Sequence, residues 1–598
     1  MRKADRIKNY DGQNPFFDNQ ARNFSDEKVL NEFYPISSFW DLFNDQHEII
    51  LGTRGSGKTF LLKMMRYSML KRLNFPEAKK MVHNKNFIAF YVPMHLEFVA
   101  NIAPHDISRE IRITAFQIAF NFLLSQSILH EIKSFLEDFT NPIEQATIRV
   151  QLAHEIGKMW LIEGAEPITD IVELERRINE IFYGFDPSNP NNESIPIVFR
   201  KQICTPLVSI KDILLKRLNL KANPTWLVCI DEAEFLDNAL QECINNVFRS
   251  DSNRIALKVA TLPFSHTTLN TFSKDVTVAA GNDFLYHVID MDYDSADFIN
   301  LTNRLCAHRI ASRVDPAIKI NTLEDFLGKI GNDDLIDYYR NEIGEKTTDR
   351  DTIEERIVSS FSEKRKVGAS GYKNRRKTIY DKYATIFFTR EMYKLSKQGN
   401  RKPGWYAGAK TVRKIAQGNP RAFLQIMSLL FEEAKQHSLQ PKTQHQVLRS
   451  YARNFCLSTK GLNEIGPIIY KQLDEISCFL QSRVHEGYLV SAGASFILSF
   501  KSESDFRENI EWIQAAIANS RLIVSNEIKT NGITINTKYL LSYAYAAEYW
   551  IPMRSDIPTH YMINKESNNA SYQVQTKKSL GTRYDRYTNG QLSLFGED

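Results

Sequence analysis

Short apolar runs alternate with longer amphipathic stretches in the first part of the chain. Residues 48–51 and 87–92 have the length of buried strands, and apolar side chains recur at helical spacing over residues 59–73. The positions that carry this helical repeat are Leu61, Leu62, Met65 and Met69. A strand, a loop, a helix and a second strand in this order predict the start of a parallel α/β sheet.

The strand pattern stops after residue 92 and returns only far along the chain. Residues 104–220 are patterned mostly as helices. Strand candidates then follow at residues 226–230, 255–261 and 284–291, separated by helical or loop segments. We therefore predict one sheet that is interrupted by a large helical insertion.

The C-terminal part mixes helix and strand patterns. Residues 510–517 read as a helix, and residues 522–524 and 533–535 read as strands. Lys-Thr-Asn-Gly at residues 529–532 is typical of a hairpin turn that joins such strands. A helix followed by a hairpin matches a winged-helix module, so we expect an α+β module of this type here.

Composition narrows the class of protein. Of the 598 residues 43% are hydrophobic and 25% are charged, which are ordinary values for water-soluble globular domains. No apolar run approaches 18 residues, and the first residues lack the apolar core of a signal peptide. We expect a cytoplasmic, nucleoid-associated protein of several folded units that neither spans a membrane nor is secreted.

The cysteines and histidines do not form a metal-binding pattern. Six cysteines are scattered without a C-x-x-C pair, and the 13 histidines show no H-E-x-x-H spacing. The cysteines are Cys204, Cys229, Cys243, Cys306, Cys456 and Cys478. We expect reduced, mostly buried thiols, and neither a zinc centre nor a disulfide framework.

A glycine-rich loop follows the first predicted strand and opens the first predicted helix. It reads Gly52-Thr53-Arg54-Gly55-Ser56-Gly57-Lys58-Thr59, a complete G-x-x-x-x-G-K-[ST] motif. In such a loop the backbone N–H groups surround phosphate oxygens, and the helix N-terminus adds positive potential. Lys58 would reach the β- and γ-phosphates, and the Thr59 hydroxyl would ligate Mg²⁺. The motif predicts a site for ATP and Mg²⁺.

Two adjacent carboxylates end the strand at residues 226–230. Asp231 can hold Mg²⁺ through water, and Glu232 can polarise the attacking water as the catalytic base. Glu234 is an alternative base, but the tandem Asp231-Glu232 favours Glu232. Taken alone, an acidic strand end is usually only a helix N-cap. The glycine-rich loop makes the Mg²⁺ role the better interpretation.

These motifs, together with Gly418-Asn419-Pro420-Arg421, resemble an AAA+ ATPase of the origin-recognition type, a relative of the STAND signalling ATPases. The resemblance covers roughly residues 14–435. It implies that Arg421 senses the γ-phosphate at the start of a lid helix, and that Thr261 is the polar tip of the sensor 1 strand. It also implies an arginine finger, for which Arg249 and Arg254 are the nearest candidates. A surface cation that caps a turn is the alternative for Arg421.

The fold class expected is thus an α/β P-loop NTPase core with a parallel sheet, a helical insertion, a helical lid and a C-terminal winged-helix-like α+β module. The chain departs from a compact core because 173 residues separate Lys58 from Asp231. The expected parts are an N-terminal arm (1–45), an ATPase core (46–295) with its insertion (about 104–220), a lid (296–460), an α+β module (461–556) and a flexible tail (557–598).

Positive charge is concentrated between residues 364 and 414. Sixteen Lys and Arg face two carboxylates there, a net charge of +14, whereas the whole chain carries only +5. Such a segment would bind nucleic acid with little sequence preference, and a solvated surface is the alternative. The candidate contacts are Lys364, Arg365, Lys366, Lys373, Arg375, Arg376 and Lys377.

The last residues carry a short apolar peptide behind a polar linker. Gln591-Leu592-Ser593-Leu594-Phe595 resembles the peptide with which bacterial polymerases and repair proteins bind the DNA sliding clamp. Leu592, Leu594 and Phe595 would be the apolar anchors, and Gln591 would supply a directional amide. The alternative is that the tail folds back onto its own domain.

Together these patterns predict an ATP-hydrolysing molecular switch that acts on DNA and is recruited to the sliding clamp. Homo-oligomerisation on ATP binding, an effector protein encoded elsewhere, and a role in anti-phage defence or mobile-element control belong to the same hypothesis. The alternative is a STAND-like signalling ATPase that senses a protein ligand without binding DNA. The salt dependence of DNA binding distinguishes the two.

Overall fold

The computed structural model describes residues 3–18, 24–103, 107–161, 168, 170–220, 223–250, 254–273, 275–315, 317–330, 372–398, 403–486, 493–555 and 558–563. Of α17 it describes the helix, but no side chain before Tyr383. The chain divides into two compact units, Met1–Tyr561 and Met562–Asp598, and the fold below is that of the first unit. Within the described ranges, none of the helices combines the length and apolar character needed to cross a membrane.

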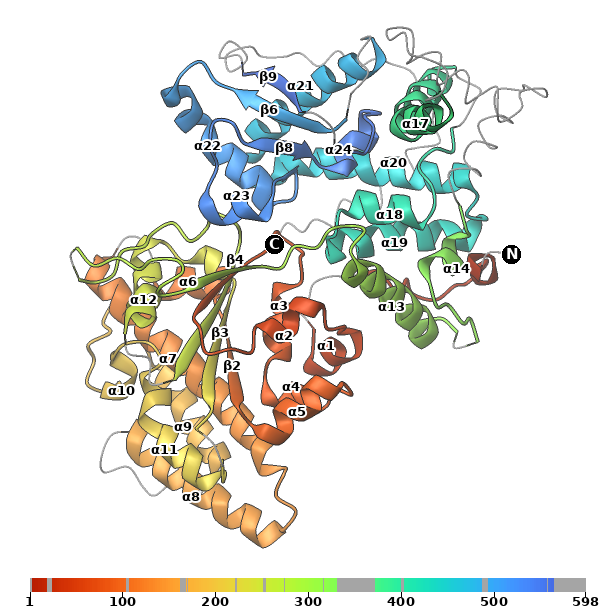
Figure 1. Ribbon diagram of the computed structural model, residues 1–598. Coiled ribbons are helices and arrows are strands. Elements are labelled where there is room, and N and C mark those ends of the chain that lie inside the picture. The colour runs from red at the N-terminus through yellow and green to blue at the C-terminus, as the bar shows by residue number, and fades with distance from the viewer. Residues whose placement is uncertain are drawn as a thin grey trace. The chain divides into compact units, whose positions relative to one another are not determined.

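A five-stranded sheet forms the centre of the N-terminal half (Figure 1). Its strands are β1 (Glu48–Leu51), β2 (Phe87–Pro93), β3 (Thr225–Asp231), β4 (Ile255–Thr261) and β5 (Leu285–Val288). They are all parallel and lie in the order β2-β3-β4-β1-β5. Every residue of β3 and β4 is buried, which is why both strands are mostly apolar, with Lys258 of β4 as a buried exception. The predicted parallel α/β core is confirmed.

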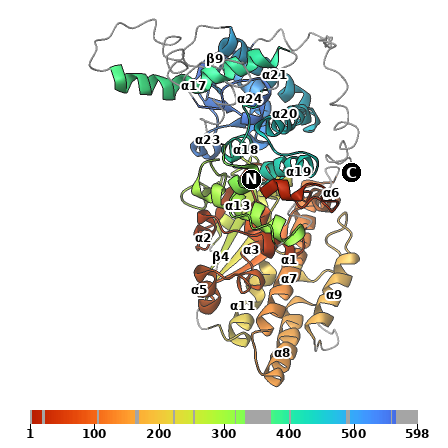
Figure 2. The ribbon, with the colours of Figure 1, turned by 90° about the vertical axis from the view of Figure 1, so that its right-hand side faces the viewer.

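The helical insertion lies between β2 and β3, as predicted. It contains α6 (Leu96–Ile102), α7 (Arg109–Leu136), α8 (Pro142–Trp160), α9 (Ile171–Tyr183), α10 (Ile197–Arg200) and α11 (Thr205–Arg217). Helix α7 packs against β2, and α8, α9 and α11 lie beside it (Figure 2). Phe116 and Phe120 of α7 are fully buried in the same core as Phe90 and Trp226 of the sheet. The insertion and the sheet therefore share one hydrophobic core.

The helix predicted after the glycine-rich loop is two helices, α3 (Lys58–Met64) and α4 (Tyr67–Leu70), and α5 (Pro76–Asn84) follows them. The break is at Arg66, whose backbone is extended with ψ 144°. Its side chain donates to the Lys63 carbonyl and forms an ion pair with Asp26 at 2.6 Å. The apolar spacing continues across the break, so the pattern alone reads as one helix.

The N-terminal arm contributes η1 (Lys3–Ile7), α1 (Asp26–Glu32) and α2 (Ser37–Asp41). It packs on the helices that follow the sheet. Glu32 forms a buried ion pair with Arg309 at 2.5 Å, and the ring of Phe16 lies 5.9 Å from that of Phe431. The arm is therefore part of the folded body of the protein.

The region after the sheet is helical, as predicted. This region contains α13 (Ala296–Arg313), α14 (Leu323–Leu327), α17 (Tyr372–Ser396), α18 (Ala409–Ala416), α19 (Pro420–Gln436) and α20 (Pro441–Ser458). Two further elements, η3 (Ala233–Phe235) and α12 (Asn238–Arg249), belong to the core and lie between β3 and β4. Helices α18, α19 and α20 pack on one another in sequence order. The Gly418-Asn419-Pro420-Arg421 turn connects α18 to α19.

The C-terminal module is α+β, but its predicted hairpin is wrong. The module contains η5 (Thr459–Gly461), α21 (Gly466–His485), β6 (Ser495–Ser499), α22 (Glu503–Ala518), β7 (Leu522–Ile523), α23 (Asn526–Asn531), β8 (Lys538–Leu541), α24 (Tyr543–Glu548) and β9 (Thr559–Met562). Its sheet has the order β7-β8-β6-β9. Residues 529–531 end helix α23, and Gly532, at φ 94°, is the C-cap of that helix. A left-handed glycine serves a helix end as well as a hairpin turn, so the local signal was ambiguous.

Candidate nucleotide-binding site

The glycine-rich loop connects β1 directly to α3, in the context that the motif requires. Gly55 and Gly57 have left-handed backbones, with φ 88° and 101°. A Cβ atom on Gly55 would lie 2.7 Å from Cβ of Arg421 and 2.7 Å from Oδ1 of Asn419. Glycine is therefore required at Gly55 both by its backbone conformation and by the close approach of the 418–421 turn.

Lys58 is the cationic centre of the loop. Its Nζ donates to the carbonyl oxygen of Gly52 at 2.6 Å and to that of Thr53 at 3.4 Å. Burial lowers the pKa of Lys58, and the carboxylates of Glu234, Asp290 and Asp231 act in the opposite direction. A buried ammonium at the N-terminus of a helix is a favourable place for a phosphate.

The polar atoms of the site fit a phosphorylated ligand with a divalent cation. Ser56 Oγ and Thr261 Oγ1 are buried and find no hydrogen-bond partner among the described residues. Asp231 accepts hydrogen bonds from the Thr59 side chain and, at 2.9 Å, from the Tyr91 hydroxyl. The structure thus brings the two predicted Mg²⁺ ligands, Thr59 and Asp231, into contact. Burial raises the pKa of Asp231, and the hydrogen bonds from Thr59 and Tyr91 and the charge of Lys58 act in the opposite direction.

The two candidate bases occupy different surroundings. Glu232 has a left-handed backbone (φ 59°), and its Oε2 lies 2.6 Å from Nδ1 of His95, which follows β2. Glu234 is directed toward the loop, where the charge of Lys58 acts on it, and burial raises its pKa. His95 was not found from the sequence, because it lies 137 residues from Glu232 and belongs to no motif.

The lid turn lies on the glycine-rich loop. Asn419 caps α19 with its side chain and donates from Nδ2 to the Arg54 carbonyl at 2.7 Å. The Arg421 N–H approaches the Gly55 carbonyl at 3.4 Å, and the positive charge of Arg421 lowers the pKa of Lys58. At the end of β4, the Thr261 carbonyl accepts from the Gly52 N–H at 3.3 Å. Both residues assigned to sensors therefore border the loop.

A comparison with family models decides the family, since the model described as ORC-CDC6-like matches residues 14–557. The chain belongs to the ORC-CDC6-like family. Membership identifies it as an AAA+ ATPase of the ORC/Cdc6 type, a nucleotide-driven class that typically uses Mg²⁺. No curated protein and no solved structure matches the chain.

In this ORC-CDC6-like chain, the two candidate arginine fingers lie away from the chain's own loop. Arg254 directly precedes β4 and donates to the Asn223 carbonyl at 2.6 Å. Arg249 pairs with Asp283, just before β5, at 2.7 Å. Both arginines lie at the edge of the sheet where the parallel strands begin, opposite the edge that carries Lys58. Either arginine would have to act on the nucleotide of another subunit, and the finger assignment stays a prediction.

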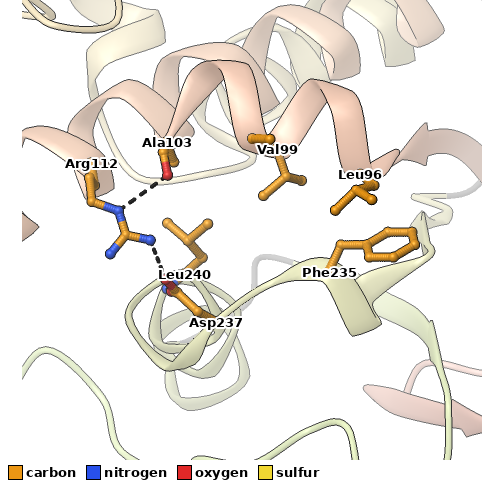
Figure 3. A pocket seen from close by; sticks show the side chains of 8 residues that line it. Leu96, Val99, Ala103, Arg112, Phe235, Asp237 and Leu240 are labelled. Atoms are coloured by element: carbon orange, nitrogen blue, oxygen red, sulfur yellow. Dashed lines mark hydrogen bonds and ion pairs between the residues drawn. The ribbon is translucent and has the colours of Figure 1, made fainter. Parts of the chain in front are cut away.

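An apolar cavity of about 300 Å³ lies beside the Glu232–His95 pair of the ORC-CDC6-like core. One wall is α6 and the other is η3 with the start of α12, so the walls begin just after His95 and Glu232 (Figure 3). Arg112 joins the walls, because it donates to the Ala103 carbonyl at 3.3 Å and pairs with Asp237. Nothing in the sequence pattern predicted this cavity.

The remaining predicted contacts fall outside the described side chains. Lys373, Arg375, Arg376 and Lys377 belong to helix α17, but their side chains are not described. The other predicted contacts lie outside the described residues: Lys364, Arg365, Lys366, Gln591, Leu592, Leu594 and Phe595. The five described buried cysteines and the exposed Cys478 are free thiols, as predicted.

Proposed function

We propose that this protein hydrolyses ATP with Mg²⁺ and uses the nucleotide state as a molecular switch. The single observation that carries the proposal is the contact of the lid turn with the glycine-rich loop. Arg421 and Asn419 lie against Gly55 and Arg54, so a nucleotide at the loop would contact core and lid together. The position of the lid would then depend on the nucleotide.

The residues of the site have separate tasks in this proposal. Backbone N–H groups of the loop and Lys58 bind and orient the phosphates, and Thr59 with Asp231 would hold Mg²⁺. When bound, Mg²⁺ neutralises charge on the phosphate oxygens. Glu232 accepts the proton of the attacking water at a carboxylate oxygen, and His95 contacts the same carboxylate. Arg421 and Thr261 contact the terminal phosphate.

Two substitutions test the assignment. Lys58→Ala should lose nucleotide binding, because it removes the charge that compensates the phosphates. Glu232→Gln should bind ATP but turn it over about a hundredfold or more slowly, because it removes only the proton acceptor. Glu234→Gln is the matched control, an isosteric change two residues away. Wild-type turnover in Glu232→Gln together with a loss in Glu234→Gln would transfer the role of base to Glu234.

We further propose that the switch acts on DNA and is recruited to the bacterial sliding clamp. The excess of positive charge between residues 364 and 414 supports the first part, and the Gln591–Phe595 peptide supports the second. ATP-dependent homo-oligomerisation would bring Arg249 or Arg254 to a neighbouring nucleotide. Anti-phage defence or mobile-element control, with an effector encoded elsewhere, is the biological setting that we propose. The large insertion and the tail favour it over housekeeping initiation.

A STAND-like signalling ATPase is the second candidate. The observation that favours it is the contact between the C-terminal module and the nucleotide loop, where the Arg54 N–H donates to the Ala518 carbonyl at 3.0 Å. Such a contact suits a closed switch that a protein ligand opens. DNA binding with a steep salt dependence supports the first candidate, and its absence supports the second.

A further inference from the structure

Asp290 connects the nucleotide loop to the C-terminal module. It lies two residues after β5, and its Oδ1 accepts from both the N–H and the hydroxyl of Thr53, each at 2.9 Å. Its Oδ2 accepts from Nζ of Lys529 in α23 at 2.7 Å. One carboxylate therefore joins the second residue of the loop to Lys529, which lies 239 positions beyond Asp290 in the chain.

The bridge is nearly closed to solvent. The side chains of Lys529 and Asp290 are 6% and 15% exposed, far less than those of an ordinary surface ion pair. The stability of a nearly buried ion pair depends on both partners, because removal of one leaves the other charge uncompensated. Lys529 is thus the cation that allows Asp290 to hold Thr53 with its second oxygen.

A second contact joins the same two parts of the chain. The Arg54 N–H donates to the carbonyl of Ala518, the last residue of α22, at 3.0 Å. The Arg54 carbonyl in turn accepts from Asn419 of the lid. Thr53 and Arg54, adjacent in the loop, are therefore held from the C-terminal module on one side and from the lid on the other.

A small cavity borders the bridge. A cavity of about 150 Å³ separates the parts, and Thr53, Asp290, Gly418, Ile523 and Lys529 are among its lining residues. The Asp290–Lys529 pair connects the loop and α23 at the edge of this cavity.

The negative charge of Asp290 also acts on Lys58, the phosphate-binding lysine, and raises its pKa against the effect of burial. Without Lys529, Asp290 would place an uncompensated negative charge beside the position of the phosphates. That charge would repel the nucleotide, and Asp290 would also lose the contact that fixes its position beside Thr53.

We propose that Lys529 is a positioning residue of the nucleotide loop, acting through Asp290 on Thr53, so that the C-terminal module helps to retain the nucleotide. The inference rests on the proposed ATP site. By thermodynamic linkage, a bound nucleotide strengthens the docking of the module by the same factor by which the docked module strengthens nucleotide binding. Loss of nucleotide therefore favours release of α22 and α23 from the loop.

The test compares nucleotide release from full-length variants with a fluorescent ATP analogue and Mg²⁺. Lys529→Ala should release it on the order of tenfold faster, in the usual range of such couplings, and should raise KM for ATP without lowering kcat. Lys529→Arg keeps the charge and should be close to wild type. Lys538→Ala, an exposed lysine on β8 of the same module, is the matched control. In an Asp290→Asn background, Lys529→Ala should have much less effect.

Amide hydrogen exchange without nucleotide gives an independent readout. The N–H groups of Thr53 and Arg54 should exchange faster in Lys529→Ala than in wild type. The first donates to Asp290, which Lys529 positions, and the second donates to Ala518 of the C-terminal module. Equal release and equal exchange in wild type and Lys529→Ala would overturn the inference while leaving the ATP site intact. If wild type binds no nucleotide, the proposed function fails, and the exchange experiment still decides whether Lys529 holds the loop.

Discussion

Gly418, the glycine of the lid turn, has no room for a side chain. Its φ is 74°, and a Cβ atom there would lie 1.7 Å from the backbone oxygen of Met291. Gly281 has a similar φ of 85°, but a Cβ atom would meet nothing within 4 Å. We expect Gly281→Ala to cost about 1 kcal/mol from backbone strain alone, and Gly418→Ala to cost more than about 3 kcal/mol. Urea denaturation of both variants measures the difference, and equal losses would contradict it.

Several histidines are buried in the neutral form. The Nδ1 of His47 accepts from the Leu257 N–H at 3.0 Å, and burial lowers the pKa of His47 to about 4. Burial also lowers the pKa of His266 and His485 to about 4 and that of His445 further. Unfolded histidine titrates near pH 6.5, so the unfolded chain gains protons first as the pH falls. Stability should be constant above about pH 6.5 and decrease between pH 6.5 and 4.

His47→Gln tests this pH dependence. Glutamine can still accept from Leu257 but does not titrate, so its thermal midpoint should decrease less between pH 7 and 5 than that of wild type. One histidine accounts for at most about 1.4 kcal/mol per pH unit. An unchanged slope in the variant would show that His47 is not among the groups responsible.

At the scale of elements, helix α17 (Tyr372–Ser396) contains part of the basic segment. If this segment binds DNA, changing Arg375, Arg376 and Lys377 together to Ala should reduce the salt slope of binding by about one unit for each lost phosphate contact. The exposed residues Lys79 and Lys80 of α5 provide a control in which two positive charges are removed elsewhere on the protein. Equal slopes for the triple variant and the Lys79→Ala, Lys80→Ala control would assign the segment to a solvated surface.

Elements were predicted where each had a local pattern of its own. The strands β3 and β4 are buried throughout and mostly apolar, and they appear at the expected positions. Helix α23 was missed, because residues 526–531 carry no apolar repeat and are followed by Gly532, a glycine that also suits a hairpin. In the structure, Lys529 of this helix bonds to Asp290, a contact that no local pattern contains.

At the scale of the molecule, the C-terminal peptide predicts a partner. Deleting residues 591–595 should abolish binding to purified bacterial sliding clamp and leave ATP hydrolysis unchanged. A short peptide with a few apolar anchors should bind with roughly micromolar affinity, with Leu594 and Phe595 contributing most. Ser593→Ala, between the anchors, is the matched control. If full-length protein and the deletion variant bind clamp equally, or neither binds, the recruitment proposal fails.

The sequence by itself determined the ATP-binding motif, the parallel core and the presence of an insertion. These follow from contiguous signals, such as the eight residues from Gly52 to Thr59 or the unbroken apolar run before Asp231. Short-range patterns persist in the fold because they depend on backbone geometry and burial of neighbouring side chains.

Only the tertiary structure decided which distant groups meet at the site. His95 approaches Glu232, and Lys529 approaches Asp290, because separate strands and modules end at the same edge of the sheet. Each of these pairs joins charges or polar atoms more than a hundred residues apart, and His95, Asp290 and Lys529 belong to no nucleotide-binding motif of the sequence. The free energy of such contacts depends on burial, which exists only once the sheet, the lid and the C-terminal module have assembled.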